Sequence, residues 1–196
     1  MEAMKAVVLE EFGAEPVLRT VPRPVPAPGE VLVRVASSGV NPLDVKISAG
    51  AAAHARVTPP MILGIDLAGT VAGVGDGVTR FAAGDEVYGM TGGVGDRPGS
   101  LAEYASVDQD LLARKPGKLS MAEAAALPLA VITAWEGLVD RAGTREGQLV
   151  LVHGGAGGVG HVAVQLALAR GATVFATGSG ARLWVPQPRM LTTCPV

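Results

Sequence analysis

The sequence predicts a fold in two parts, an all-β part (a barrel or a sandwich) followed by a parallel α/β unit. Residues 1–115 hold many short segments rich in β-branched residues, separated by turns that contain glycine or proline. The pattern changes to a helical one at Ser120. An apolar segment at 148–153 then leads directly into a glycine-rich loop and a second helical segment. The predicted fold class is therefore α/β plus β.

Composition and charge exclude several classes of function. The 196 residues carry a net charge of −2 without any basic run, so nothing favours binding to nucleic acid or to an anionic membrane surface. Glycine, proline or a charge interrupts each apolar stretch before it reaches membrane-spanning length. The N-terminus lacks the apolar core of a signal peptide. We expect a soluble cytoplasmic protein.

The single cysteine, Cys194, limits the possible covalent and metal chemistry. One cysteine cannot form a disulfide within the chain, and a cysteine-based structural zinc site needs two to four thiolates. His54, His153 and His161 are scattered without the spacing of metal ligands. The sequence therefore predicts no metal site.

The first part of the chain is predicted to consist mainly of strands. The expected strands cover residues 4–10, 17–20, 30–36, 67–75, 86–89 and 102–107. Four prolines within 21–29 predict an extended connection, because proline cannot donate to a central ladder. Asn41 and Pro42 predict the start of a short helix, with Asn41 as its N-cap.

The second part is predicted to be one βαβ unit preceded by two helices. Ser120-Met-Ala-Glu123 is a capping box that starts the first helix, and Pro128 should end or break it before a second helix over 129–139. A strand at 148–153 of the buried parallel type, a helix over 159–169 and a strand over 172–176 follow. Thr133 and Trp135 lie on an apolar helix, which predicts core positions for both.

The loop after the strand at 148–153 has the pattern of a dinucleotide-binding loop. Glycine is required for the tight turn, for backbone approach to a pyrophosphate and for close packing of helix on strand, and the helix N-terminus attracts phosphate. A glycine-rich turn in an unrelated α/β protein stays an alternative. The predicted cofactor-binding residues in the loop are Gly155, Ala156, Gly157, Gly158, Val159 and Gly160.

An absence of acidic residues favours NADP(H) over NAD(H). NAD-binding units place a carboxylate at the end of the second strand for the ribose hydroxyls, but no Asp or Glu follows Glu146 in this chain. Ser179 and Arg182 could instead hydrogen-bond and pair with a 2′-phosphate. The alternative is that these two residues only begin a solvated helix.

Several polar residues can be explained by structural roles alone. The segment Gly39-Val-Asn41-Pro-Leu-Asp44 is by itself a polar turn. Asp66 is either a buried polar partner or a turn residue, and Tyr104 is a half-buried strand residue. His153 ends a strand and is expected to be structural rather than catalytic.

Taken together, these segments resemble the medium-chain dehydrogenase/reductase superfamily, and within it the zinc-independent NADPH:quinone oxidoreductase-like branch. The resemblance runs from about Met4 to about Gly180. Its specificity comes from the order of nine segments, at 4–8, 28–35, 39–44, 60–69, 74–78, 81–87, 99–104, 127–135 and 153–160.

The resemblance implies a fold, a reaction and two candidate catalytic residues. The implied fold is a GroES-like β-barrel domain for the substrate (1–119) and an incomplete Rossmann domain for the cofactor (120–180). The implied reaction is hydride transfer from NADPH to a quinone or other electron-poor double bond, by an enzyme that is a homodimer in the family. Asn41 and Thr133 match positions near the nicotinamide, whereas Asp44 is expected to be architectural.

Zinc independence is implied by two replacements. Zinc-dependent relatives have a cysteine ligand at the position of Asn41 and a His-Glu pair at Ile65-Asp66. An amide and an apolar side chain therefore stand where two ligands would be, so zinc-activated alcohol chemistry is not expected.

The sequence departs from the family pattern in two places. The arginine that usually follows the Asn-Pro-x-Asp segment near Ser48 is missing, and the match stops at about Leu183. We therefore expect residues 181–196 to be an atypical tail, a frameshifted or mis-joined end of a truncated product. Two alternatives to the reductase remain, a catalytically incompetent fragment of such an enzyme and an enoyl-reductase module of a larger synthase.

Overall fold

The computed structural model describes residues 2–95 and 97–178, and the chain forms two compact units, Met1–Leu129 and Ala130–Val196. The division comes later in the chain than the change of sequence pattern at Ser120. The reason is that the first helix after Ser120 packs on the strands of the first unit. Each unit is described by itself.

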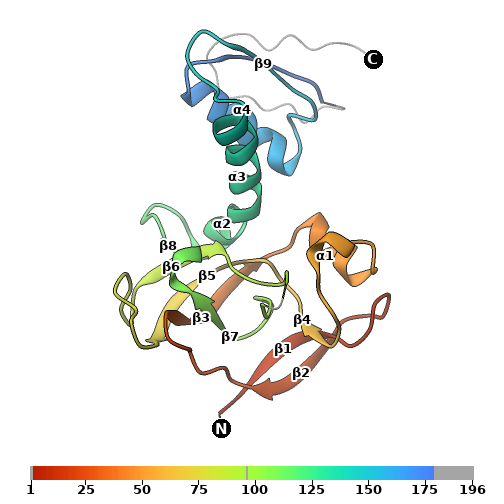
Figure 1. Cartoon of the computed structure of the whole chain (residues 1–196), viewed down its shortest axis with the longest axis vertical. Helices are drawn as coiled ribbons and strands as arrows, with labels where there is room; N and C mark the ends of the chain where they lie inside the picture. The colour runs from red at the N-terminus through yellow and green to blue at the C-terminus, as the bar shows by residue number, and fades with distance from the viewer. Residues whose placement is uncertain (1, 96, 179–196) are drawn as a thin grey trace. The chain divides into compact units, whose positions relative to one another are not determined.

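The first unit contains two antiparallel sheets (Figure 1). The three-stranded sheet has the order β2-β1-β4, with β1 at Ala3–Leu9, β2 at Val17–Pro22 and β4 at Met61–Ile62. The five-stranded sheet has the order β7-β3-β5-β6-β8, with β3 at Glu30–Gly39, β5 at Asp66–Val74, β6 at Glu86–Met90, β7 at Tyr104–Asp108 and β8 at Ala113–Arg114. An isolated bridge from Ala6 to Ala102 joins strand β1 to the segment before β7.

All six strands predicted for the first part are present. The sequence pattern missed β4 and β8, because two residues are too few to show an alternation. The proline-rich segment before β3 is an extended connection, and β2 is an edge strand as its terminal Pro22 requires.

The core of the first unit is formed mainly by side chains from the strands of the five-stranded sheet. Val31 and Val33 of β3 are fully buried, and they pack with Leu67 of β5, Val87 of β6 and Val107 of β7. A second cluster, around Leu9, Ile47 and Ile65, packs helix α1 (Pro42–Ser48) against the end of β1. The helix begins after its N-cap Asn41, as predicted.

Helix α2 (Met121–Ala125) covers β3 and β5. The predicted capping box at its start is present, because Ser120 N donates to Glu123 Oε2 (2.8 Å) and Glu123 N donates to Ser120 Oγ (3.2 Å). Gly39 at the end of β3 allows this packing, since a Cβ there would lie 2.3 Å from the carbonyl oxygen of Ala125. Two short 3₁₀ helices, η1 at Ala53–Ala55 and η2 at Gln109–Leu111, complete the unit's helical segments within the described residues.

Helix α3 (Pro128–Trp135) starts at the proline that was predicted to break the helical segment. It begins in the last two residues of the first unit and continues into the second. The prediction of one helix over 129–139 is correct only as far as Trp135, because a π-helical segment, η3 (Glu136–Arg141), follows.

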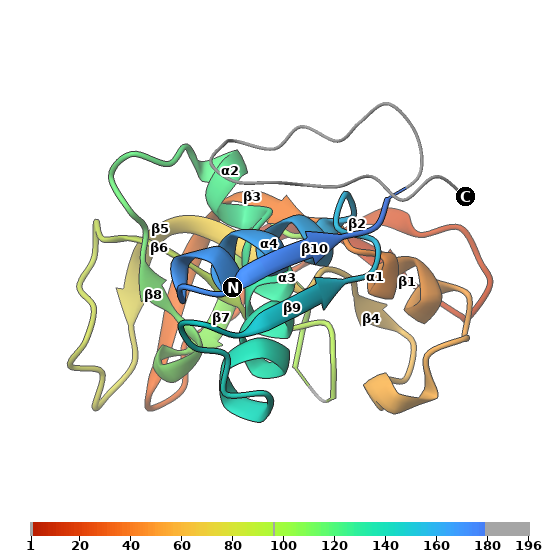
Figure 2. The ribbon, with the colours of Figure 1, turned by 90° about the horizontal axis from the view of Figure 1, so that it is seen from above.

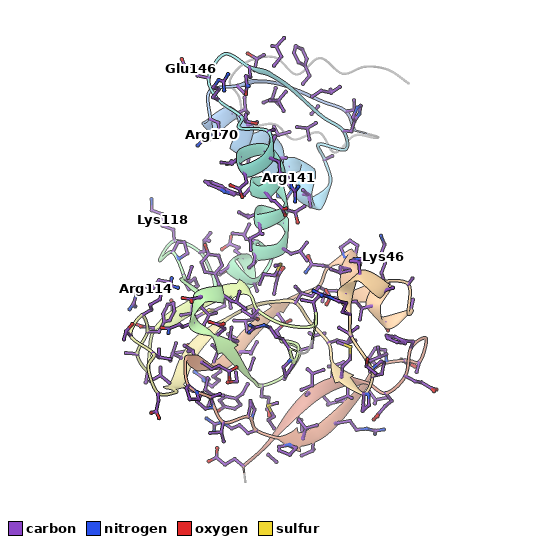
Figure 3. The ribbon with its side chains drawn as sticks, viewed as in Figure 1. Lys46, Arg114, Lys118, Arg141, Glu146 and Arg170 are labelled. Atoms are coloured by element: carbon purple, nitrogen blue, oxygen red, sulfur yellow. The ribbon has the colours of Figure 1, made fainter. Side chains whose placement is uncertain are left out.

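The second unit is the predicted βαβ motif, with β9 at Leu149–Val152, α4 at Gly158–Ala169 and β10 at Thr173–Ala176 (Figure 2). The two strands are parallel, with Leu149 paired to Thr173 and Val152 paired to Ala176. Gly171 ends α4 with φ at +81°, and Arg170 Nε donates to Thr144 O at 3.0 Å, which ties the end of the helix to the segment before β9 (Figure 3).

Only one face of this small sheet is covered among the described residues. Val152 and Val174 pack against α4, whereas Leu149, Leu151 and Phe175 on the other face are 75, 58 and 40% exposed. The prediction of a strand buried on both faces is therefore wrong for β9. The core positions predicted for Thr133 and Trp135 are also wrong, because both side chains are exposed on α3.

Candidate functional site

The glycine-rich loop lies between the end of β9 and the start of α4, as the sequence predicted. Gly160 must be glycine, because a Cβ there would lie 2.0 Å from the carbonyl oxygen of Gly154. Gly155 is buried, and a Cβ there would come within 2.7 Å of the Cβ of Ala176 on β10. These two glycines therefore set how closely the loop packs on its own turn and on the neighbouring strand.

The remaining loop residues present backbone to solvent. Ala156, Gly157 and Gly158 are exposed, and a Cβ on Gly158 would meet no atom within 4 Å. The first turn of α4 has N–H groups without acceptors inside the helix, and the helix dipole adds a partial positive charge there. This geometry fits a pyrophosphate, which needs backbone donors and close approach without side chains.

Thr177 at the end of β10 holds the loop to this strand. Its carbonyl oxygen accepts from Gly155 N at 2.8 Å, and its Oγ1 accepts from Gly154 N at 3.3 Å. The same Oγ1 lies 3.3 Å from Nδ1 of His153, an exposed residue at the end of β9. A neutral hydroxyl thus occupies the strand end where NAD-binding units carry a carboxylate. Thr177 carries no signal of this role in the sequence, because its partners lie more than twenty residues earlier.

Asn41 is half-buried between β3 and α1 and is held by two carboxyl groups. Its backbone N donates to Asp44 Oδ2 at 2.7 Å, and its side-chain Nδ2 donates to Asp66 Oδ2 at 3.0 Å. Asp44 thus has the architectural role that was expected, as the N3 residue that caps the chain entering α1.

Asp66 is a fully buried polar partner, which settles the two alternatives left by the sequence. Its carboxylate accepts from Asn41 and also from Leu129 N, at 3.1 and 3.2 Å. Ser100 Oγ, itself buried, donates to the Asp66 carbonyl oxygen at 2.8 Å and lies 2.8 Å from Ser38 Oγ. Ser38 and Ser100 had no sequence signal, because both hydrogen bonds join segments that are distant in the chain.

Burial perturbs both carboxyl groups. Desolvation raises the pKa of Asp66 from 3.8 to about 6, against the lowering effect of its hydrogen bonds to Asn41 and Leu129, and the nearby Asp44 raises it further. Desolvation also raises the pKa of Asp44, whose Oδ1 is buried without a hydrogen-bond partner in the described part of the chain. Carboxyl groups with raised pKa values beside a candidate catalytic residue are a common feature of functional sites, and they make this part of the first unit a candidate site.

The other candidate residues lie elsewhere or outside the described structure. Thr133 is on α3 in the second unit, so the structure does not place it relative to Asn41. Ser179 and Arg182 lie outside the described residues. Within residues 2–95 and 97–178, no group of three or more His, Cys, Asp or Glu side chains has the geometry of a metal site.

Comparison with known families assigns the first unit. Residues 27–117 match the alcohol dehydrogenase GroES-like domain. A crystal structure of an alcohol dehydrogenase superfamily protein from Novosphingobium aromaticivorans superposes with a TM-score of 0.89 at 59% identity, over 90% of this chain and 54% of that one. The chain belongs to the medium-chain dehydrogenase/reductase superfamily. The predicted fold class, a GroES-like domain followed by part of a Rossmann domain, is thereby confirmed.

Proteins similar to this chain include both reductases and polyketide synthase proteins. A 2-methylene-furan-3-one reductase of Solanum lycopersicum is 43% identical over 84% of this chain and 44% of its own length. An NADPH-dependent alkenal/one oxidoreductase of Arabidopsis thaliana is 40% identical over the same shares. A spectinabilin polyketide synthase protein of Streptomyces orinoci is 44% identical over 80% of this chain but only 7% of its own.

A quinone oxidoreductase from Coxiella burnetii also shares the superfamily fold, with a TM-score of 0.82 at 37% identity over 91% of this chain and 57% of that one. The chain thus spans a little under half the length of the two plant reductases that it matches. The described residues contain no helix that is long and apolar enough to cross a membrane.

Proposed function

We propose that this superfamily member is a zinc-independent reductase that transfers a hydride from NADPH to a quinone or another electron-poor double bond, such as that of an enone. The observation that carries the proposal is the glycine loop, whose exposed backbone and helix N-terminus fit a pyrophosphate and whose neighbouring strand ends in a hydroxyl at Thr177. The identity to two plant reductases of activated double bonds supports the acceptor class.

In this proposal the two parts of the chain bind different molecules. Residues 1–119 serve the acceptor, and residues 120–180 hold the cofactor. Bound NADPH would supply the hydride itself, so the chain's own residues have to bind, orient and exclude water. The loop at 155–160 and the first turn of α4 bind the pyrophosphate. Asn41 presents an amide fixed by Asp66, which orients the reacting partners through a group that does not change its charge.

The preference for NADPH over NADH rests on the absence of a carboxylate at the end of β10. A carboxylate at that position would repel a 2′-phosphate, and the sequence has none after Glu146. Ser179 and Arg182 are the candidate partners of the 2′-phosphate. The proposed location is the cytoplasm and the proposed partner is a small molecule.

Zinc independence follows from the donor set in the same way. Asn41 and Ile65 replace two ligands, and the Asn41 amide is already engaged by Asp66. We therefore expect that dialysis against a chelator leaves the rate of NADPH oxidation unchanged. A loss of activity that Zn²⁺ restores would contradict zinc independence.

The binding test is a fluorescence titration with NADPH, with NADH as the control. NADPH should bind about tenfold or more tightly, the equivalent of one charge-assisted hydrogen bond to the 2′-phosphate. Oxidation of NADPH is then followed by absorbance with a quinone and with an alkenal as acceptors. A chain that binds neither cofactor would refute the proposal, and binding without turnover would favour the non-catalytic alternative.

The Asn41 test separates orientation from binding. Asn41→Ala should lower kcat by roughly ten- to a hundredfold, because the orienting amide is lost, while NADPH affinity stays within about twofold. An exposed surface change, Lys118→Ala, serves as the control and should leave kcat unchanged. Unaltered kinetics of the Asn41 variant would remove this residue from the mechanism.

The polyketide synthase relative favours one second candidate, an enoyl-reductase module. The chain matches only a small part of that protein, as a module within it would. An enoyl thioester offered in the same assay distinguishes the two functions. A clear preference for the thioester over quinones and alkenals would favour the module.

A further inference from the structure

Asp66 connects three separate segments of the first unit at one buried point. It begins β5, which lies next to β3 (Figure 1), and it pairs there with Gly39 of β3. Its carboxylate receives hydrogen bonds from Asn41 Nδ2 and from Leu129 N, and its carbonyl oxygen receives one from Ser100 Oγ. The side chain has no exposed surface, so water does not compete for these bonds.

The Asn41 amide interacts with the side chains of both Asp44 and Asp66, and the charge of Asp66 restricts how it faces. An ionised carboxylate only accepts hydrogen bonds, so the amide must turn its NH₂ group, and not its oxygen, towards Asp66. A protonated carboxyl can also donate, and it would then accept either end of the amide. Ionised Asp66 therefore selects one of the two amide orientations, which differ in what Asn41 offers to a bound molecule.

The same carboxylate holds the start of α3. Pro128, the first residue of this helix, has no N–H, so Leu129 N–H is the first backbone donor of the helix. Asp66 accepts from this donor with both oxygens, at 3.1 Å to Oδ1 and 3.2 Å to Oδ2. The carboxylate thus links the backbone N–H of Leu129 and the Asn41 side chain within the first unit.

No compensating cation holds this charge in place within the described residues. The Lys and Arg side chains there that form ion pairs have other partners, and the charged group that acts on Asp66 is the second buried carboxyl, Asp44, which opposes ionisation. A group in these surroundings titrates closer to neutral pH than an exposed aspartate, and its pKa is raised to about 6.

We propose that Asp66 is the positioning residue for Asn41, holding its side-chain amide in one orientation and linking it to the backbone of Leu129. This inference rests on the proposed function, in which Asn41 orients the reacting partners. Asp66 acts through Asn41 and does not touch the acceptor. Its role is distinct from a merely structural one, because it depends on the ionised form and so predicts a pH dependence.

The direct test is nuclear magnetic resonance of the chain without cofactor. The Asn41 side-chain NH₂ signals and the Leu129 amide signal should shift together on titration between about pH 4.5 and 7.5, with one midpoint near the pKa of about 6. In Asp66→Asn this shared titration should disappear. Ser100→Ala, which removes the hydrogen bonds of the Ser100 hydroxyl to the Asp66 carbonyl oxygen and to Ser38 but leaves those of the Asp66 carboxylate in place, should keep it. Separate midpoints for Asn41 and Leu129, or an unchanged titration in Asp66→Asn, would overturn the inference.

The kinetic test uses the same two variants with NADPH and a quinone. Asp66→Asn should lower kcat by about tenfold with little change in KM, and it should lack the acidic limb of the wild-type kcat profile. Ser100→Ala should keep that limb. Equal profiles of the wild type and Asp66→Asn would overturn the positioning role, even in an active enzyme. A wild type that oxidises no NADPH would instead refute the proposed function, and the resonance titration would still decide whether Asp66 holds Asn41.

Discussion

At the scale of single residues, the buried charge of Asp66 has a cost that a positioning role explains. The ionised form loses its hydration on folding, and three hydrogen bonds to its carboxylate oxygens recover only part of that loss, as the raised pKa shows. A neutral amide or a threonine would avoid this loss. A carboxylate is the side chain that can accept from two donors at once and can force the orientation of a neighbouring amide.

This cost predicts a pH dependence of stability. Folding raises the pKa of Asp66 from its ordinary value of 3.8 to about 6. Between pH 3.8 and pH 6, the folded chain therefore keeps a proton that the unfolded chain has lost. The free energy of unfolding should therefore fall by roughly 2 to 3 kcal/mol as the pH rises from about 4 to about 6, and change little above that. Urea unfolding of the wild type and of Asp66→Asn at a series of pH values measures this.

The comparison of the wild type with Asp66→Asn also corrects for the titration of Asp44. Asp44 also has a raised pKa, so it adds a slope of the same sign, but it is present in both proteins. The difference between the two curves therefore reports Asp66. A difference that does not vary with pH would mean that Asp66 has an ordinary pKa in the folded chain.

Residue roles were predictable from the sequence where the contacts are local. Asn41 and Asp44 lie within one turn of each other, so a helix start could be recognised from residue types alone. Asp66 joins residues 25 and 63 positions away, and no spacing rule connects them. The side chain of Thr133 was misplaced for the converse reason, because an apolar helix does not reveal which of its faces is covered.

At the scale of elements, the capping box at Ser120, Pro128 and the glycine loop each fixed a boundary that the sequence could predict. Each acts through hydrogen bonds or clashes within a few residues. The change from α to π geometry at Glu136 was not predictable in this way. The Trp135 indole donates to Asp140 at 3.1 Å and Arg141 pairs with Glu136, so both contacts join residues five positions apart. These pairs of residue types do not by themselves indicate a π-helix in the sequence.

The glycine loop gives the prediction at this scale. Gly160→Ala should open the loop, because its Cβ would lie 2.0 Å from Gly154 O and 2.9 Å from Gly155 Cα, both backbone atoms. We expect a loss of about 2 kcal/mol in stability and at least tenfold weaker NADPH binding. Gly158→Ala is the matched control, because its Cβ meets no atom within 4 Å and its melting temperature should equal that of the wild type. Equal melting curves for the two variants would show that the loop does not pack as described.

At the scale of the whole molecule, the two units have cores of very different size. The main cluster of the first unit contains Val and Leu side chains from β3, β5, β6 and β7, together with Phe81 and Leu112 from the segments that connect strands. The cluster of the second unit, within the described residues, is made of Ala134, Ala163, Ala167, Ala172 and Ala176 with Val152 and Val174. Because alanine buries little apolar area, the second unit has much less hydrophobic stabilisation per residue. This difference could not be derived from the βαβ pattern, which does not specify how many faces of the sheet are covered.

Hydrogen exchange should therefore separate the two units. Amides of β3 and β5 should exchange only by global unfolding of their unit, whereas those of β9 and β10 should exchange through a lower-energy opening, at least tenfold faster. NADPH at about one hundred times its Kd should slow exchange in β9, α4 and β10 by about a hundredfold, since a ligand that binds only the closed form stabilises it by mass action. The amides of β1 and β2 are the internal control for general effects of the ligand. Equal protection of both units without ligand would contradict the difference in core size, and protection that NADPH does not change would place the cofactor elsewhere than at the glycine loop.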